Sequence, residues 1–220
     1  MYTGAEEGYT NQLSPVFICI QNASHLPATS LPTLKMPKEA ESVKHLLATL
    51  SAPNATPTLR VHFPEKTVTQ PGVKLSKAES AKPPTLSISS SLVTPDATGE
   101  KKYVVVALDL DPPFPSFPVM GPILHGLHAD LTPGTTVEEG EANTEPIAVY
   151  VGPGPPPPSA PHRYVFLVFE QPPNMNTESM RERLGLGEKP GVRARVRWDQ
   201  EAAEKKLGLG RVVAGNYFIC

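Results

Sequence analysis

The chain is poor in cysteine and has no long apolar run. Among its 220 residues the only cysteines are Cys19 and Cys220, near opposite ends. This content excludes the disulfide framework of a small secreted domain and favours a reducing compartment. The longest apolar run near the start, Val16 to Ile20, is too short to cross a bilayer and lacks the basic flank of a secretory signal. We therefore expect a cytoplasmic protein with no transmembrane segment.

The chain also lacks an excess of charge of either sign. Lys plus Arg number 20 and Asp plus Glu number 22, for a formal net charge of -2. Nucleic-acid-binding proteins usually present a basic face to the phosphates, so we expect no nucleic acid among the partners. One local run, Arg193 to Trp198, alternates arginine with apolar residues. This period of two predicts a strand with one solvated basic face, with a phosphate-contacting surface as the alternative.

Proline, in contrast, is abundant. The chain has 27 prolines, and where they cluster they disfavour long helices and central strands, because each removes a backbone donor. Long connecting loops are therefore expected. Residues 1–37 mix Ser, Thr, Asn and Pro with little periodicity, which predicts a flexible N-terminal arm. The rest, 38–220, has the length and apolar content of one domain with one core.

Hydrophobic spacing predicts mainly strands. Apolar residues at helical spacing predict a helix over Pro37–Leu50, and Asp199 caps a second one that ends at Leu207. Alternating or continuous apolar runs predict strands at Thr58–Phe63, Thr85–Ser89, Tyr103–Leu110, Ala148–Gly152, Arg163–Glu170 and the final Arg211–Cys220. The first two are expected at sheet edges and Tyr103–Leu110 at a centre. Because strands and helices do not alternate, the fold class is mainly β with a few peripheral helices.

Polar residues stand at the ends of apolar segments in two places. In "ALDLDPPFPS", Asp109 and Asp111 follow a strand, and two carboxylates at i and i+2 of an extended chain point the same way. In "GPILHGLHADLTPG", His125 and His128 follow a short apolar run. A rigid scaffold can present such side chains to a ligand. Asp111 fits a turn cap beside Pro112 equally well.

A third segment, "YVGPGPPPPSAPHRYVFLVFEQ", combines glycines, stiff prolines and a histidine. Gly152 and Gly154 allow a ligand to approach the backbone, while Pro155 and Pro156 stiffen the wall of a site. His162 ends the loop just before the next strand. This segment predicts one side of a binding pocket.

Together these segments resemble the phosphatidylethanolamine-binding protein family. "DLDPP" is similar to its Asp-Pro-Asp-x-Pro box and "GPGPPPPSAPHRYVF" to its Gly-x-Gly-Pro-Pro...His-Arg-Tyr loop. "GPILH" resembles the fungal type, including carboxypeptidase Y inhibitor-like members. The resemblance runs from about Leu59 to Ile219, with Leu110 replacing the usual proline and Leu124 replacing the first of two histidines of the animal branch.

This resemblance implies a large central antiparallel sheet packed on a smaller sheet, with an anion pocket at one end of the strands. The ligand-binding residues that it implies are Asp109, Asp111, Pro113, His125, Gly154, Pro155, Pro156, His162 and Tyr164. A neighbouring carboxylate favours a charged imidazole, so His125 and His162 would donate to phosphate or acetate oxygens. Asp109 would orient a histidine or accept from the ammonium of ethanolamine.

Two functions stay open on this basis. The first is a binding protein for phospholipid head groups or other small anions, with a serine carboxypeptidase or a kinase as a possible protein partner and with no catalytic residue. The second is an accessory protein of fungal secondary metabolism that assists cyclisation or dimerisation of an anhydride-type intermediate, with Asp109 or His125 as general base. No cofactor or metal is expected, since Asp109, His125 and His162 lack tight ligand spacing, and no Gly-x-Ser-x-Gly elbow indicates a hydrolase.

Overall fold

The computed structural model describes residues 36–53, 55, 59–88, 101–132 and 145–220. These residues belong to one compact unit. The predicted N-terminal arm over 1–37 lies outside the described residues apart from Met36 and Pro37, so the arm and the domain boundary stay predictions. No helix in the described ranges is long and apolar enough to cross a membrane.

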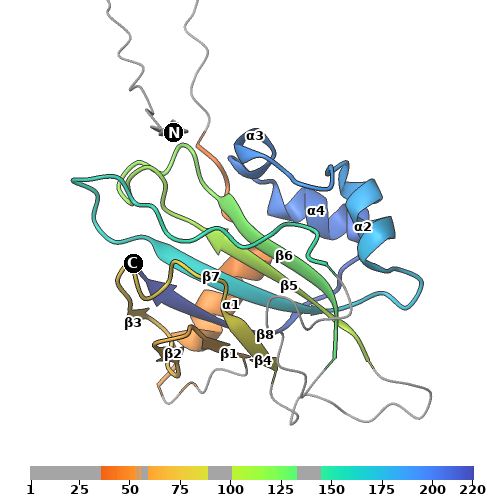
Figure 1. The fold of residues 1–220 in the computed structure, drawn as a ribbon, viewed down its shortest axis with the longest axis horizontal. Helices are drawn as coiled ribbons and strands as arrows, with labels where there is room; N and C mark the ends of the chain where they lie inside the picture. Colours follow the sequence, from red (N-terminus) through yellow and green to blue (C-terminus); the bar gives the residue numbers. More distant parts are fainter. Residues whose placement is uncertain (1–35, 54, 56–58, 89–100, 133–144) are drawn as a thin grey trace, which may run out of the picture. The chain divides into compact units, whose positions relative to one another are not determined.

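Strands dominate the described part of the chain, where they form two sheets (Figure 1). The larger sheet has the order β3-β8-β7-β5-β6 and the smaller has the order β2-β1-β4. All pairings are antiparallel except that of β3 with β8. The strands are β1 (Leu59–His62), β2 (Thr67–Val68), β3 (Val73–Lys74), β4 (Thr85–Ile88), β5 (Tyr103–Asp109), β6 (Ile123–Leu131), β7 (Arg163–Glu170) and β8 (Val212–Ile219). The mainly β fold class is confirmed.

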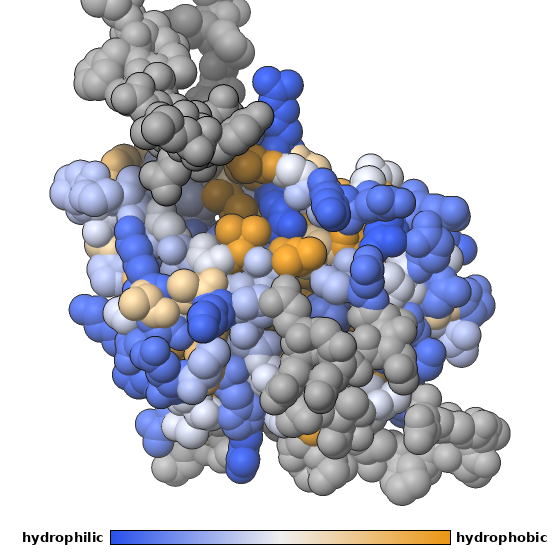
Figure 2. All heavy atoms as spheres, in the orientation of Figure 1, coloured by the Kyte–Doolittle hydropathy of each residue, from blue (hydrophilic) through white to orange (hydrophobic). Residues whose placement is uncertain are grey.

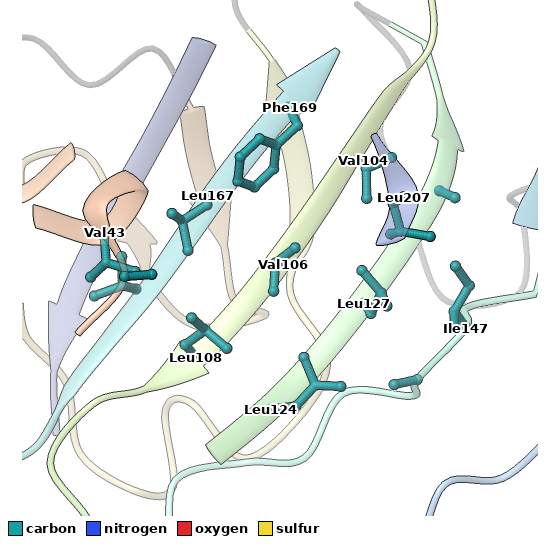
Figure 3. Packing of buried hydrophobic residues seen from close by; sticks show 14 of the residues in the cluster. Val43, Val104, Val106, Leu108, Leu124, Leu127, Ile147, Leu167, Phe169 and Leu207 are labelled. Carbon is teal, nitrogen blue, oxygen red and sulfur yellow. The ribbon is translucent and has the colours of Figure 1, made fainter. Parts of the chain in front are cut away.

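The larger sheet is buried on both faces because its central strands are apolar at nearly every position. On β5, Val104, Val106 and Leu108 belong to one hydrophobic cluster, while Val105 and Ala107 belong to the other. Figure 3 shows the first cluster, in which the strand side chains meet residues of the helices. The second cluster lies between the larger sheet and the smaller one. The core is therefore layered as helices, large sheet and small sheet.

Helix α1 (Glu41–Leu50) packs on β8 and β7 and forms part of the helical layer. Its buried residues Val43, Leu46 and Leu50 follow the helical spacing in the sequence. The helix comes close to β8 at Gly215, where an added Cβ would contact both the Leu46 side chain and the Phe166 carbonyl oxygen, the latter at 2.5 Å. Only glycine allows this separation between helix and sheet.

The other helices group together on one side of the unit (Figure 1). They are α2 (Thr177–Leu184), α3 (Val192–Arg195) and α4 (Gln200–Leu207). The predicted helix after Asp199 is confirmed, since the Asp199 side chain accepts from the backbone N–H of Ala202. Helix α2 was not predicted from the sequence. It begins at a capping box of Asn176 and Ser179.

Three strand predictions need correction. The run Arg193–Trp198 is not a strand, because its first part is helix α3 and the Arg195 side chain is buried. Ala148–Gly152 forms only an isolated bridge between Leu127 and Ala148, since the prolines and glycines that follow cannot continue a ladder. Strand β1 is the middle strand of its sheet rather than an edge, and β6 was not predicted as a strand at all.

Candidate functional site

A cavity of about 520 Å³ lies at the end of β5. Its walls come from the chain after β5, the start of β6, the Gly-Pro loop before β7, and helix α3 with its flanks. The lining residues are Asp109, Pro112, Pro113, Met120, Ile123, Leu124, His125, Val151, Gly152, Gly154, Pro156, His162, Pro190, Gly191, Val192, Arg195 and Val196. On the face that Figure 2 draws, hydrophobic side chains gather around a hollow. Segments far apart in the sequence thus build one site.

Asp109 and His162 form a buried pair at this cavity. The Nδ1–H of His162 donates to Oδ2 of Asp109 across 2.9 Å. Nε2 of His162 lies 2.9 Å from the Ser159 hydroxyl and 3.2 Å from the Pro113 carbonyl oxygen. Burial alone lowers the pKa of His162, but the hydrogen bond and the charge of Asp109 outweigh it and raise that pKa above its ordinary value. Nδ1 faces a carboxylate oxygen and Nε2 faces a carbonyl oxygen, and both are acceptors, so this geometry favours the imidazolium with a proton on each nitrogen.

His125 differs from His162 in its protonation. Its Nδ1 donates to the Val151 carbonyl oxygen across 2.6 Å, and a carbonyl only accepts, so the proton of the neutral ring sits on Nδ1. Burial lowers the pKa of His125, against the opposing effects of the Val151 carbonyl and Asp109. Nε2 then carries no proton and lies 3.9 Å from Oδ2 of Asp109. The expectation that both imidazoles donate to an anion stays a prediction, and the neutral form that burial favours for His125 would present an acceptor at Nε2 instead.

Asp111 does not line the cavity. It accepts from the backbone N–H of Arg163 at 2.8 Å and from Nε and Nη2 of the same side chain at 3.0 and 2.7 Å. Strand β5 ends at Asp109, so the i and i+2 alternation of an extended chain no longer applies at Asp111. The carboxylate joins the end of β5 to the start of β7 and supports the site from outside.

The Gly-Pro loop contributes only some of its predicted residues. Gly154 and Pro156 line the cavity, whereas Pro155 does not, and its carbonyl oxygen accepts from Nζ of Lys77 at 2.6 Å. An added Cβ at Gly154 would meet nothing within 4 Å, but one at Gly152 would lie 2.8 Å from the Ala81 carbonyl oxygen. The close backbone approach therefore involves Gly152 and the protein itself.

Tyr164 lies beneath the cavity rather than on its surface. Its ring packs edge-on against His125, with the centroids 5.1 Å apart, and stacks on Phe218. Its hydroxyl is buried and has no hydrogen-bond partner among the described residues. Burial, together with the nearby charge of Asp109, raises the pKa of this phenol. Tyr164 therefore holds His125 in place.

Arg195 is a charged lining residue that the sequence analysis did not assign to the pocket. It is 8% exposed, and its guanidinium donates to the carbonyl oxygens of Pro190, Leu124 and Val149 at 2.9, 3.1 and 3.0 Å. These bonds tie α3 to the start of β6 and place a positive charge in the cavity wall. No carboxylate within the described ranges forms an ion pair with it. The alternating sequence from Arg193 to Arg197 does not indicate that Arg195 is buried while Arg193 and Arg197 are exposed.

The comparisons with known proteins identify the family of this chain. A family model described as phosphatidylethanolamine-binding protein matches residues 61–218. The chain belongs to this family. The larger sheet packed on a smaller one is thus the fold of a phosphatidylethanolamine-binding protein. Within the described ranges, no group of three or more His, Cys, Asp or Glu residues is arranged to hold a metal ion.

Individual relatives extend the comparison. The chain is 31% identical over 192 residues to "Phomoidride biosynthesis cluster protein N" of Talaromyces stipitatus, covering 79% of this chain and 93% of that protein. Its fold is similar to that of a carboxypeptidase Y inhibitor solved in complex with the cognate proteinase, at a TM-score of 0.57 and 19% identity over 81% of this chain and 92% of that one. It is also similar to the phosphatidylethanolamine-binding protein from Plasmodium vivax, at a TM-score of 0.54 and 16% identity over 84% of this chain and 98% of that one.

Proposed function

We propose that this family member binds a small anionic group, such as a phosphate or carboxylate, in the cavity at the end of β5. The observation that carries the proposal is the charge of the cavity wall. The imidazolium of His162 and the carboxylate of Asp109 offset each other, whereas the buried Arg195 contributes a positive charge. A net positive charge in a partly dry site attracts an anion more strongly than it would in water.

His125 adds a requirement on the ligand. In the neutral ring that burial favours, Nδ1 donates to Val151 and Nε2 carries no proton, so a ligand that brings a donor of its own is favoured. A singly protonated phosphate has both a negative oxygen and an O–H, and so does a hydroxy acid. The polar floor of the cavity therefore suits an anion with one hydrogen-bond donor.

Calorimetric titration with phosphate and with acetate tests this proposal. His162→Gln keeps a hydrogen-bonding side chain beside Asp109 and removes the positive charge, so phosphate affinity should fall roughly tenfold or more. His45→Gln, on the exposed side of α1, is the matched control and should bind as the wild type does. Equal affinities of the wild type and His162→Gln would remove the pocket from the function.

The physiological source of the anion and the protein partner belong to the same proposal. The family supports a phospholipid head group as the source, and the fold neighbour solved with its cognate proteinase supports a serine carboxypeptidase as the partner. A kinase partner stays a prediction from the sequence. A cytoplasmic location remains our expectation from the cysteine content. Inhibition assays with carboxypeptidase Y test the protease directly, and no inhibition at micromolar protein would exclude it.

A second candidate function comes from the Talaromyces relative. The name of that relative places it in a biosynthesis cluster, and a general base requires an unprotonated nitrogen such as Nε2 of a neutral His125. We therefore propose as the alternative that the cavity assists cyclisation or dimerisation of an anhydride-type intermediate. Incubating candidate anhydrides with the wild type and with His125→Gln tests this. A product profile that is the same with and without the protein would contradict it.

A further inference from the structure

We infer that the ligand is an amphipathic acid: an anionic group held at the floor of the cavity and carrying an apolar body that lies along its outer wall. This inference deepens the proposed anion binding and rests on it. Its chemical class is a free carboxylic acid with a short to medium apolar chain or ring, and a hydroxyl group on that acid would supply the donor that His125 accepts. Three features of the cavity carry it, namely size, the placement of polar atoms, and the exposure of the wall.

The cavity is larger than an inorganic anion needs. Its volume is about 520 Å³, whereas one water occupies roughly 30 Å³ in the liquid and acetate or phosphate only a few times that. Cavities of roughly 300 to 1,000 Å³ are the size that holds organic ligands. A bare phosphate would leave most of this space to water.

Polar groups that can meet a ligand lie at one end of the cavity. At the floor, Oδ2 of Asp109 lies 2.9 Å from Nδ1 of His162 and 3.9 Å from Nε2 of His125. Arg195 adds its charge, but the three bonds that its guanidinium makes are to backbone carbonyls. Because these donors are already used, Arg195 attracts an anion through its charge but does not bind a polar group of the ligand along the wall.

The outer wall is apolar and partly open to water. Met120, Val151 and Val192 line the cavity and are 43%, 47% and 74% exposed. They come from three different segments: the loop after β5, the Gly-Pro loop and α3. Ile123, Leu124 and Val196 continue the apolar surface inward. An apolar body seated here would remove all three exposed side chains from water, and that burial is favourable.

A chain-length series tests the inference. Acetate, butyrate, hexanoate and octanoate are titrated into the full chain by calorimetry. Burying one methylene is worth about 0.8 kcal/mol, so affinity should rise roughly fourfold per added methylene until the wall is covered. The same affinity from acetate to octanoate would overturn the inference and leave anion binding intact.

Variants at the wall locate the effect. Val192→Ser should weaken octanoate binding several-fold and leave acetate binding unchanged, and Val151→Ser should weaken octanoate binding more than acetate binding. Val149→Ser is the matched control. Val149 and Val151 are 42% and 47% exposed, but Val149 does not line the cavity. All three positions are exposed, so the variants should fold. Loss of octanoate affinity in Val149→Ser as large as in Val151→Ser would overturn the inference.

Two further ligands distinguish a failure of the amphipathic-acid inference from a failure of the proposed anion binding. Octan-1-ol has the same apolar body without the charge, so affinity equal to that of octanoate would overturn the proposed anion site. Vesicles of phosphatidic acid and phosphatidylcholine test a membrane as the source of both groups. Binding to vesicles that octanoate does not compete away would overturn the inference in favour of a lipid surface.

Discussion

His162 and Asp109 are 53 residues apart in the chain and 2.9 Å apart in the fold. Strands β5 and β7 pair antiparallel, with Asp109 opposite Tyr164, so the end of one strand meets the approach to the other. The pairing of apolar strands thus assembles the charged pair at the rim of the sheet. It couples the pKa of His162 to the charge on Asp109.

Asp109→Asn should lower the pKa of His162. The substitution keeps an oxygen that can accept from Nδ1 but removes the negative charge that opposes the effect of burial. Titration of the histidine ring protons by NMR measures the change. Glu170→Gln, at the far end of β7 and paired with Lys101, is the control. An unchanged His162 titration in Asp109→Asn would show that the carboxylate does not set the charge.

Arg195→Ala should destabilise the fold by about 3 kcal/mol. Three carbonyl oxygens lose their donors, and leaving buried acceptors unpaired is costly. Urea denaturation measures the free energy of unfolding. Arg193→Ala in the same helix removes an exposed side chain and should change that free energy by no more than about 0.5 kcal/mol. Equal effects of the two substitutions would contradict the role assigned to Arg195.

His128 should make the protein sensitive to mild acid. Burial lowers its pKa to about 4, so the unfolded chain takes up a proton first and stability falls as the pH drops from about 6.5 toward 4. The loss between pH 7 and pH 4.5 is about 2 kcal/mol from this group. His162 acts in the opposite sense, because its raised pKa gives stability that is fully present below about pH 6.5 and lost as the pH rises.

His128→Met should remove this part of the acid sensitivity. Nδ1 of His128 is buried without a partner among the described residues, so an apolar replacement leaves no acceptor unpaired. Urea unfolding at the two pH values gives the comparison, with the exposed His45→Gln as control. A loss on acidification as large in His128→Met as in the wild type would assign the effect to other groups.

Gly215→Val should destabilise the core by about 2 kcal/mol or more. The added side chain would meet the Leu46 side chain and the Phe166 carbonyl oxygen, the latter at 2.5 Å. A backbone carbonyl in a strand cannot change its rotamer to relieve the contact, as a side chain can. Thermal denaturation measures the effect. Gly210→Val, where an added Cβ meets nothing within 4 Å, is the control. Equal melting temperatures for the two variants would show that α1 can move off β8.

Elements with a strong apolar pattern or a clear cap were predictable from the sequence. Strands β5, β7 and β8 are near-continuous apolar runs, and α4 begins at the Asp199 cap. Helix α2 escaped because its one buried residue is Met180, which leaves no periodic signal. It is held instead by tertiary contacts, as Asp130 accepts from the backbone N–H and the hydroxyl of Thr177.

The site divides in the same way. The resemblance to the family was what placed Asp109, His125 and His162 at one pocket, and the pairing of β5 with β6 and β7 brings the ends of these strands together. The charge of His125, the turn of Asp111 toward Arg163 and the burial of Arg195 depend on neighbours distant in the chain. Protonation and side-chain direction follow from burial and from nearby partners, and these exist only once the sheets and helices have packed.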